Sequence, residues 1–228
     1  TSLTDSLRSS NDCDSAYVYN INWDQSSGTL PLFLYRTYYL SFGNCMGKKS
    51  KLIKLLSAIR NDDQVVNVEV DAVVRASRSN IANTAYQLEE IKRNQACTSA
   101  KDNSDPVVVA VIDTGVDMSH PDLAGAFYRD SAGNVVGANF LGKGTKGQPD
   151  ANWQDENGHG THVAGIIAGT SSKDPGVASC LNVKVMPIKA LGAKGTGVSI
   201  EINRAIQWAG ENGADIINLS LGHLNSVA

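Results

Sequence analysis

The strongest constraint on the fold is an apolar run that ends in a single acid and a glycine. Residues 107–115 read V-V-V-A-V-I-D-T-G, and no polar residue precedes Asp113 in this run. A short, uniformly apolar segment rich in β-branched residues predicts a strand that is buried on both faces. Strands of this kind belong to parallel sheets whose two faces are covered by helices. Asp113 is therefore expected at the end of a buried strand, where the chain turns.

The sequence after residue 84 alternates between strand patterns and helix patterns. The predicted elements are buried strands at Val107–Ile112, Val183–Ala190 and Ala214–Leu219, a helix that begins near His159, and a helix at Ile200–Asn212. Strands that alternate with helices indicate an α/β fold with a doubly wound, mostly parallel sheet. Ligands of such sheets bind outside the carboxyl ends of the strands, where Asp113, Leu191–Gly197 and Ser220–Gly222 fall.

The first 77 residues have a different pattern. They contain strand-like segments at Ala16–Ile21 and Leu30–Phe42, a helix with one apolar face at Ser50–Arg60, and a strand at Val65–Val74. This is enough for a small α+β domain. The polar segment Arg75–Asn83 shows no periodicity and predicts a linker. We therefore expect two domains, at residues 1–77 and 78–228, with an approximate boundary.

Composition narrows the classes of function. The net charge of the 228 residues is −3, and lysine and arginine are scattered, which argues against a nucleic-acid partner. No apolar run approaches the roughly 18 residues that a membrane-spanning helix needs. The chain begins at Thr1 without a signal-peptide pattern, which suggests a processed or partial product. Four cysteines show no metal-ligand spacing, and their pairing stays open.

Two histidines lie close together in the segment 157–165, which reads N-G-H-G-T-H-V-A-G. His159 and His162 are three residues apart, so a helix could direct both toward a metal ion, but a third ligand and a glutamate one turn away are missing. A helix-capping histidine is the other alternative. The D-T-G at Asp113 also matches the aspartic-protease signature, which would need a second such acid on an all-β fold. Together, Asp113 and His159 supply two thirds of an acid–base–nucleophile triad.

Five segments, read in order, resemble the subtilisin-like serine proteases. They are V-A-V-I-D-T-G-V-D at 109–117, H-P-D-L at 120–123, N-G-H-G-T-H-V-A-G at 157–165, L-G-A-K-G-T-G at 191–197 and I-I-N-L-S-L-G at 216–222. The resemblance implies that Asp113 is the triad acid and His159 the general base, with His162 as a structural residue of the helix. Asp113 should accept a hydrogen bond from the ring N–H of His159, which fixes its tautomer and stabilises the imidazolium.

The same resemblance implies residues that hold the substrate. They are Gly195, Thr196, Gly197, Ser220, Leu221 and Gly222, which should flank the bound peptide on its two sides. A peptide that is bound as an added strand needs exposed main-chain N–H and C=O groups, and glycine permits the close approach. No cofactor is expected for catalysis. A structural calcium is implied at Asp122, although the loop expected to supply most other ligands corresponds to Thr170–Asp174 and is short and altered.

The resemblance extends to both ends of the chain. K-L-I-K-L-L-S-A-I-R followed by V-V-N-V-E-V-D is similar to the end of a subtilase propeptide, which assists folding and inhibits the enzyme by leaving its tail in the cleft. The family's nucleophile motif, G-T-S-x-A, would fall after Ala228. The 228 residues alone are therefore expected to be inactive through the family mechanism.

The sequence is thus interpreted as the pro-form fragment of a secreted subtilisin-like serine endopeptidase. Its partners would be protein and peptide substrates, and its own propeptide would act as an intramolecular inhibitor that is cut off after Ser77. The alternative is a non-catalytic protein, either a protease-like scaffold or a prodomain-type protease inhibitor. A G-T-S-x-A motif further along the full-length protein would favour the enzyme.

Overall fold

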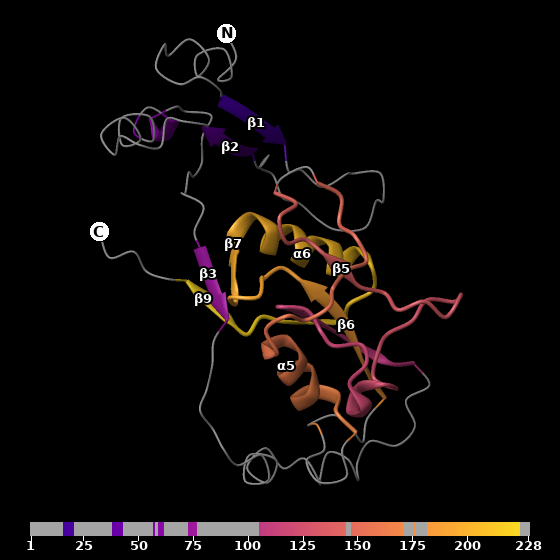
Figure 1. Cartoon of the computed structure of the whole chain (residues 1–228). Coiled ribbons are helices and arrows are strands. Elements are labelled where there is room, and N and C mark those ends of the chain that lie inside the picture. The colour runs from indigo at the N-terminus through magenta and orange to yellow at the C-terminus, as the bar shows by residue number, and fades with distance from the viewer. Residues whose placement is uncertain are drawn as a thin grey trace. The chain divides into compact units, whose positions relative to one another are not determined.

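The computed structural model describes residues 16–20, 38–42, 57, 59–61, 73–76, 105–144, 147–170, 176 and 182–223 (Figure 1). The contacts divide the chain into two compact units, Thr1–Val70 and Asp71–Ala228. The division falls before the boundary expected at residue 77, because residues 73–76 pair with strands of the second unit. The assignment of residues 1–77 to a propeptide stays a prediction.

The first unit contains an antiparallel strand pair. β1 (Ala16–Asn20) pairs with β2 (Tyr38–Phe42), and Ala16 lies opposite Phe42. Both strands fall within segments for which the sequence predicts strands. Of the helix expected over residues 50–60, the described residues 57, 59 and 60 are helical, and Ile59 is buried. The four cysteines lie outside the described residues.

A four-stranded parallel sheet forms the centre of the second unit. The strand order is β5 (Ala138–Asn139), β6 (Val183–Lys189), β4 (Val107–Asp113) and β8 (Ile216–Asn218), and all three neighbouring pairs are parallel. β4 and β6 pair over their whole length, so that Asp113 lies opposite Lys189. The expected parallel α/β sheet is confirmed. β5 lies in a glycine-rich stretch for which the sequence predicts no strand. Its extended conformation is held by pairing with β6.

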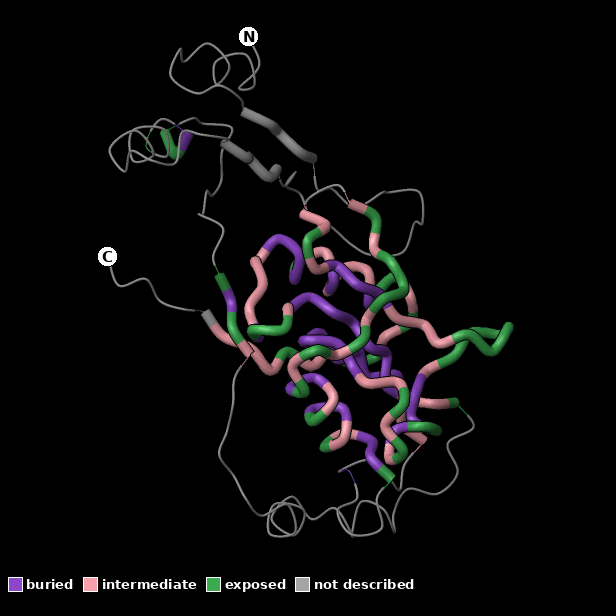
Figure 2. Tube along the Cα trace, viewed as in Figure 1, coloured by how far each residue is buried: buried purple, intermediate pink, exposed green. Residues whose placement is uncertain are grey.

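Helices cover both faces of this sheet. α5 (His159–Ala168) and α6 (Ser199–Glu211) lie on opposite sides of it (Figure 1). Successive residues of a strand face opposite sides, so Ala110 and Ile112 pack in one hydrophobic cluster with α6, whereas Val111 packs in another with α5. Figure 2 shows the buried residues gathered along these elements. Within the described residues, no helix combines the length and apolarity needed to cross a bilayer.

A second, three-stranded sheet joins segments that are far apart in the sequence. Its order is β7 (Thr196–Val198), β3 (Val73–Ala76) and β9 (Leu221–His223), and both pairs are antiparallel. Arg75 lies opposite Thr196 on one side and Gly222 on the other. The prediction that the linker begins at Arg75 is therefore wrong. Arg75 and Ala76 show no strand periodicity in the sequence, but hydrogen bonds from two neighbouring strands hold them as part of β3.

An ion pair fastens the loop that follows β5. Lys143 Nζ lies 2.6 Å from Asp150 Oδ2, and this contact, with a bond from the Asn152 N–H, lowers the pKa of Asp150 to about 2. The folded-state pKa lies below the unfolded value of 3.8, so ionised Asp150 contributes stability above pH 3.8 that is lost as the pH falls toward about 2.

We expect Lys143→Met to move the pKa of Asp150 back toward its ordinary value, because the largest cause of the shift is removed. An NMR titration of the Asp150 carboxyl measures this directly. Lys184→Met is the control, since Lys184 Nζ bonds the carbonyl oxygen of Gly125 instead. An unchanged titration of Asp150 in Lys143→Met would contradict the assignment.

Candidate active site

Asp113 and His159 meet at the carboxyl end of β4. Asp113 is the last residue of that strand and His159 the first of α5. His159 Nδ1 lies 2.7 Å from Asp113 Oδ1, and the two side chains are 7% and 0% exposed. The structure thus places the predicted acid and the predicted base in direct contact, out of water.

Burial dominates the electrostatics of this pair. It raises the pKa of Asp113, while the hydrogen bonds from His159 and from the backbone N–H of Thr114, at 2.7 Å, partly offset the effect. Asp113 Oδ2 is buried without a hydrogen-bond partner among the described residues. A carboxylate that accepts from Nδ1–H orients the imidazole and directs Nε2 toward a reacting group, as a general base requires.

A second contact runs alongside the first. The backbone N–H of Gly160 donates to Thr114 Oγ1 at 2.9 Å, so the residues that follow Asp113 and His159 are also joined. A Cβ atom at Gly160 would overlap the carbonyl oxygen of Gly115 and lie 3.1 Å from Asp113 Cβ. The helix can approach β4 closely enough for the Asp113–His159 bond because residue 160 has no side chain.

Gly160→Ala is therefore expected to destabilise the fold by about 1–3 kcal/mol, as overpacking does in a tight interior. The control is Gly165→Ala in the same helix, where an added Cβ meets nothing within 4 Å. That change should stabilise by about 0.5–1 kcal/mol, because alanine loses less backbone entropy in a helix. Denaturant unfolding of both variants measures the difference. Equal effects would show that the approach at Gly160 is not tight.

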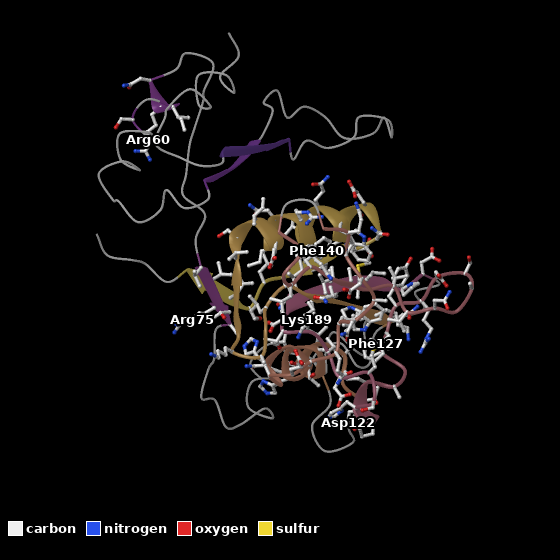
Figure 3. The ribbon with its side chains drawn as sticks, turned by 45° about the horizontal axis from the view of Figure 1, so that its top comes forward. Arg60, Arg75, Asp122, Phe127, Phe140 and Lys189 are labelled. Atoms are coloured by element: carbon white, nitrogen blue, oxygen red, sulfur yellow. The ribbon has the colours of Figure 1, made fainter. Side chains whose placement is uncertain are left out.

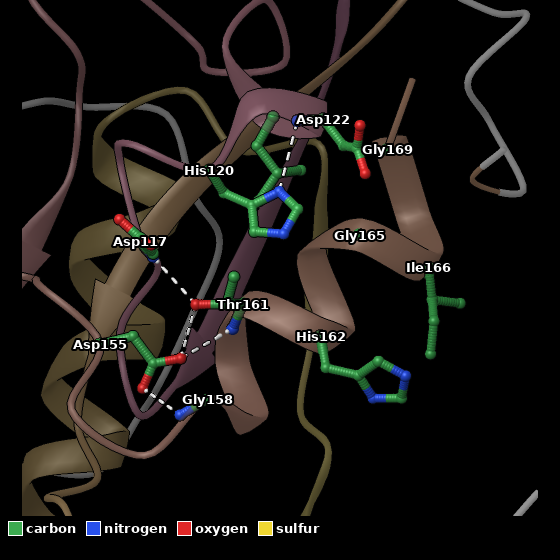
Figure 4. Close-up of a pocket in the computed structure, with 11 residues that line it drawn as sticks. Asp117, His120, Asp122, Asp155, Gly158, Thr161, His162, Gly165, Ile166 and Gly169 are labelled. Carbon is green, nitrogen blue, oxygen red and sulfur yellow. Dashed lines mark hydrogen bonds between the residues drawn. The ribbon is translucent and has the colours of Figure 1, made fainter. Parts of the chain in front are cut away.

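Asp155 organises the start of α5. Its Oδ1 accepts from Thr114 Oγ1 at 2.8 Å. The same oxygen accepts from the Gly158 N–H at 2.9 Å, and Oδ2 accepts from the N–H and hydroxyl of Thr161 (Figure 4). Burial raises the pKa of Asp155, but the hydrogen bonds from Thr161 and from the backbone N–H groups of Asn157 and Gly158 outweigh burial and leave the pKa lowered. Our sequence reasoning missed Asp155 and Thr114. An acid just ahead of a predicted helix was the available signal for Asp155.

The six residues predicted to hold substrate lie on the two sides of β3. Gly195 accepts a hydrogen bond from the Ala76 N–H through its carbonyl oxygen, at 2.9 Å. Thr196 and Gly197 belong to β7, Leu221 and Gly222 belong to β9, and Ser220 directly precedes β9. The structure therefore shows these segments pairing with an extended chain. Their role toward a substrate stays a prediction.

A pocket of about 440 Å³ lies between α5 and the 3₁₀ turn η3 (Pro121–Leu123), and Asp122 and His162 line it (Figure 4). Asp113 and His159 do not line this pocket. His162 is exposed, so burial does not support its expected structural role. Among the described residues no three acidic, histidine or cysteine side chains gather closely enough to hold a metal ion. Calcium also takes backbone carbonyl oxygens as ligands, so a calcium site at Asp122 stays a prediction. Residues 171–174 lie outside the described part.

Comparison with known proteins decides the family. Residues 104–227, more than half of the chain, match the model of the subtilase family. The chain belongs to the subtilase family. The expected family is thus confirmed, and the parallel sheet agrees with it.

Three relatives show how much of a whole protein this subtilase chain represents. It is 34% identical over 170 residues to halolysin of Haloferax mediterranei, a match that covers 73% of the chain and 31% of halolysin. It is 40% identical over 117 residues to subtilisin Savinase of Lederbergia lenta, covering 51% of the chain and 37% of that protein. It is 40% identical over 115 residues to the thermophilic serine proteinase of Bacillus sp. strain AK1, covering 50% and 25%. The chain thus spans between 25% and 37% of these relatives.

Proposed function

We propose that this subtilase is a serine endopeptidase that cleaves proteins through an acyl-enzyme, with Asp113 as the acid and His159 as the general base. The observation that carries the proposal is the buried 2.7 Å bond between Asp113 and His159, at the strand ends where α/β sheets bind ligands. The nucleophilic serine would lie in the full-length protein, outside these 228 residues.

In the proposed mechanism, His159 Nε2 takes the proton of the serine hydroxyl while the serine oxygen attacks the scissile carbonyl carbon. The same nitrogen then gives that proton to the leaving amine, which breaks the peptide bond and leaves an acyl ester. Water attacks the ester in the second half of the cycle, with His159 again as the base. Asp113 stays ionised throughout and stabilises the imidazolium through the Nδ1 bond.

We further propose that β3 marks the path of the substrate and is the tail of a propeptide. It is held on both sides by main-chain pairing, which recognises an extended peptide whatever its side chains. A tail attached to the rest of its own chain has a high effective concentration, so it would inhibit the enzyme until it is released.

Maturation tests this assignment. The full-length protein is expected to cut itself after Ser77, the residue that follows the described strand β3, and N-terminal sequencing of the mature form should begin at Arg78. A variant without His159 should accumulate uncut unless active enzyme is added. A mature N-terminus upstream of residue 65, or within the segment 86–91, would show that residues 1–77 are not a propeptide of this type.

We also propose that the protein is secreted and that it binds a structural calcium, each on a single observation. Secretion is proposed because one relative, 41% identical over 118 residues, is named the halolysin-like extracellular serine protease Nep of Natrialba magadii. A structural calcium at Asp122 rests on the match to H-P-D-L alone.

The endopeptidase itself is tested on the full-length protein with a fluorophosphonate label, which reacts with activated serines, and with casein hydrolysis. We expect labelling and hydrolysis in the wild type and neither in a folded His159→Ala variant. A folded wild-type protein that shows neither would instead support the non-catalytic scaffold.

A further inference from the structure

One buried charge plays no part in the proposed proton transfers. Lys189 ends β6 and is only 4% exposed, near the middle of the second unit (Figure 3). Lysine is almost never fully buried unless it is paired, because its ammonium loses hydration. If residue 189 only had to fill space at the end of this apolar strand, an apolar side chain would stabilise the fold more than a lysine. The charge therefore calls for a role of its own.

The ammonium group joins two separate segments. Lys189 Nζ donates to the carbonyl oxygen of Thr114 at 2.7 Å and to that of Gln154 at 3.1 Å. A third oxygen, Glu156 Oε2, lies 3.5 Å away on a side chain that is 63% exposed. An ammonium has three N–H donors, and these three oxygens match them in number. The two shorter contacts go to neutral backbone carbonyls.

The two segments are those that carry the acid and the base. Thr114 directly follows Asp113, and its N–H donates to the same Oδ1 atom that bonds His159. Gln154 directly precedes Asp155, whose carboxylate bonds the first turn of α5. Lys189 thus connects the turn after Asp113 to the loop that leads into His159. The path from its Nζ to Asp113 Oδ1 crosses only the backbone of Thr114 and two hydrogen bonds.

We infer that Lys189 is a positioning residue for the Asp113–His159 pair, acting through the Thr114 and Gln154 carbonyls. This inference rests on the proposed function, since positioning matters only if the pair is catalytic. Its consequence is that loss of the ammonium lets the turn after Asp113 and the loop before His159 move independently. The pair then loses its alignment, while the segments that bind the peptide stay in place.

The test is Lys189→Met in the full-length enzyme, matured by added active enzyme where needed. We expect kcat to fall by about 10²-fold, as a small misplacement of catalytic groups can cause, with KM little changed. The proton shared by His159 and Asp113, seen by NMR as a far-downfield imidazole resonance, should weaken or shift. Lys189→Arg, which keeps a cation and several N–H donors, should recover most of both signals.

The matched control lies on the same strand. Lys184 also bonds a backbone carbonyl, that of Gly125, at an exposed site. Lys184→Met should leave kcat and the imidazole resonance unchanged. If Lys189→Met does not fold, Lys189→Gln, which keeps two N–H donors without the charge, takes its place, with an intermediate loss of kcat expected.

The outcomes separate the inference from the function beneath it. A wild-type enzyme without activity would overturn the proposed function. An active wild type in which Lys189→Met, or its Gln replacement, keeps its kcat would overturn only the positioning role, as would an equal loss of kcat in Lys184→Met or a loss confined to KM.

Discussion

Replacing His159 with alanine in the full-length subtilase is expected to lower kcat by about 10⁶-fold, the size measured for the corresponding change in subtilisin, the family member that supplies this value. The reason is that His159 is the proposed base for the serine proton. Its Nδ1 lies 2.7 Å from Asp113 Oδ1, which leaves Nε2 to take that proton. Substrate binding should survive, since β7 and β9 pair with the chain's own strand β3 through their backbones and are proposed to hold a substrate in the same way. Steady-state kinetics on a short chromogenic peptide measures the effect.

His162→Ala is the matched control, because the residue lies on the same helix but is exposed. Its stability should stay within about 0.5 kcal/mol of wild type, as is usual for surface changes, and its kcat should be nearly unchanged. Comparable losses of kcat in two folded variants would contradict the assignment of His159 as the only base.

Asp113→Asn is expected to lower kcat by about 10⁴-fold without lowering stability at neutral pH. The amide group can present an N–H to His159, which favours the wrong imidazole tautomer. The expected effect on the free energy of unfolding comes from the pKa of Asp113, which burial raises. A raised folded-state pKa means that the stability contributed by the protonated acid is full below the unfolded value of 3.8 and is lost as the pH rises through the folded pKa.

At neutral pH the wild type thus holds a carboxylate that is costly to bury, and the neutral amide avoids that cost. Denaturant unfolding at pH 7 and again below pH 3.8 checks the sign. The variant should be at least as stable as wild type at the higher pH, and any advantage should shrink at the lower one. A variant that is clearly less stable at pH 7 would indicate that the carboxylate stabilises the fold.

The sequence allowed the centre of the fold and the pair at its edge to be predicted. An apolar run that closes on Asp113 and a helix that begins at His159 leave few arrangements once the strands are parallel, so their contact could be anticipated. The placement of an extended segment between residues 195–197 and 220–222 was anticipated from the family resemblance. Its exact extent was not, because Arg75 and Ala76 are ordered by partners distant in the sequence.

The supporting contacts could not be predicted, for a physical reason. A lysine at the end of an apolar run gives no sign of which carbonyls it will meet, since Thr114 and Gln154 come together only when the loops fold. Helical spacing likewise groups His159 with His162 but does not show that one is buried and the other exposed. Hydrogen-bond partners of this kind depend on tertiary packing, which periodicity does not encode.

Val74 of β3 is only 2% exposed and belongs to the same hydrophobic cluster as Leu191 and Ile202. On the proposed cut after Ser77, the released propeptide takes this side chain away, and the mature protease is left with a core that is one residue short. Each substrate would then complete that core for the time it is bound. Because a bound ligand stabilises the folded state, the mature enzyme should withstand heat and digestion by its own copies best while it is working, and least when it is idle.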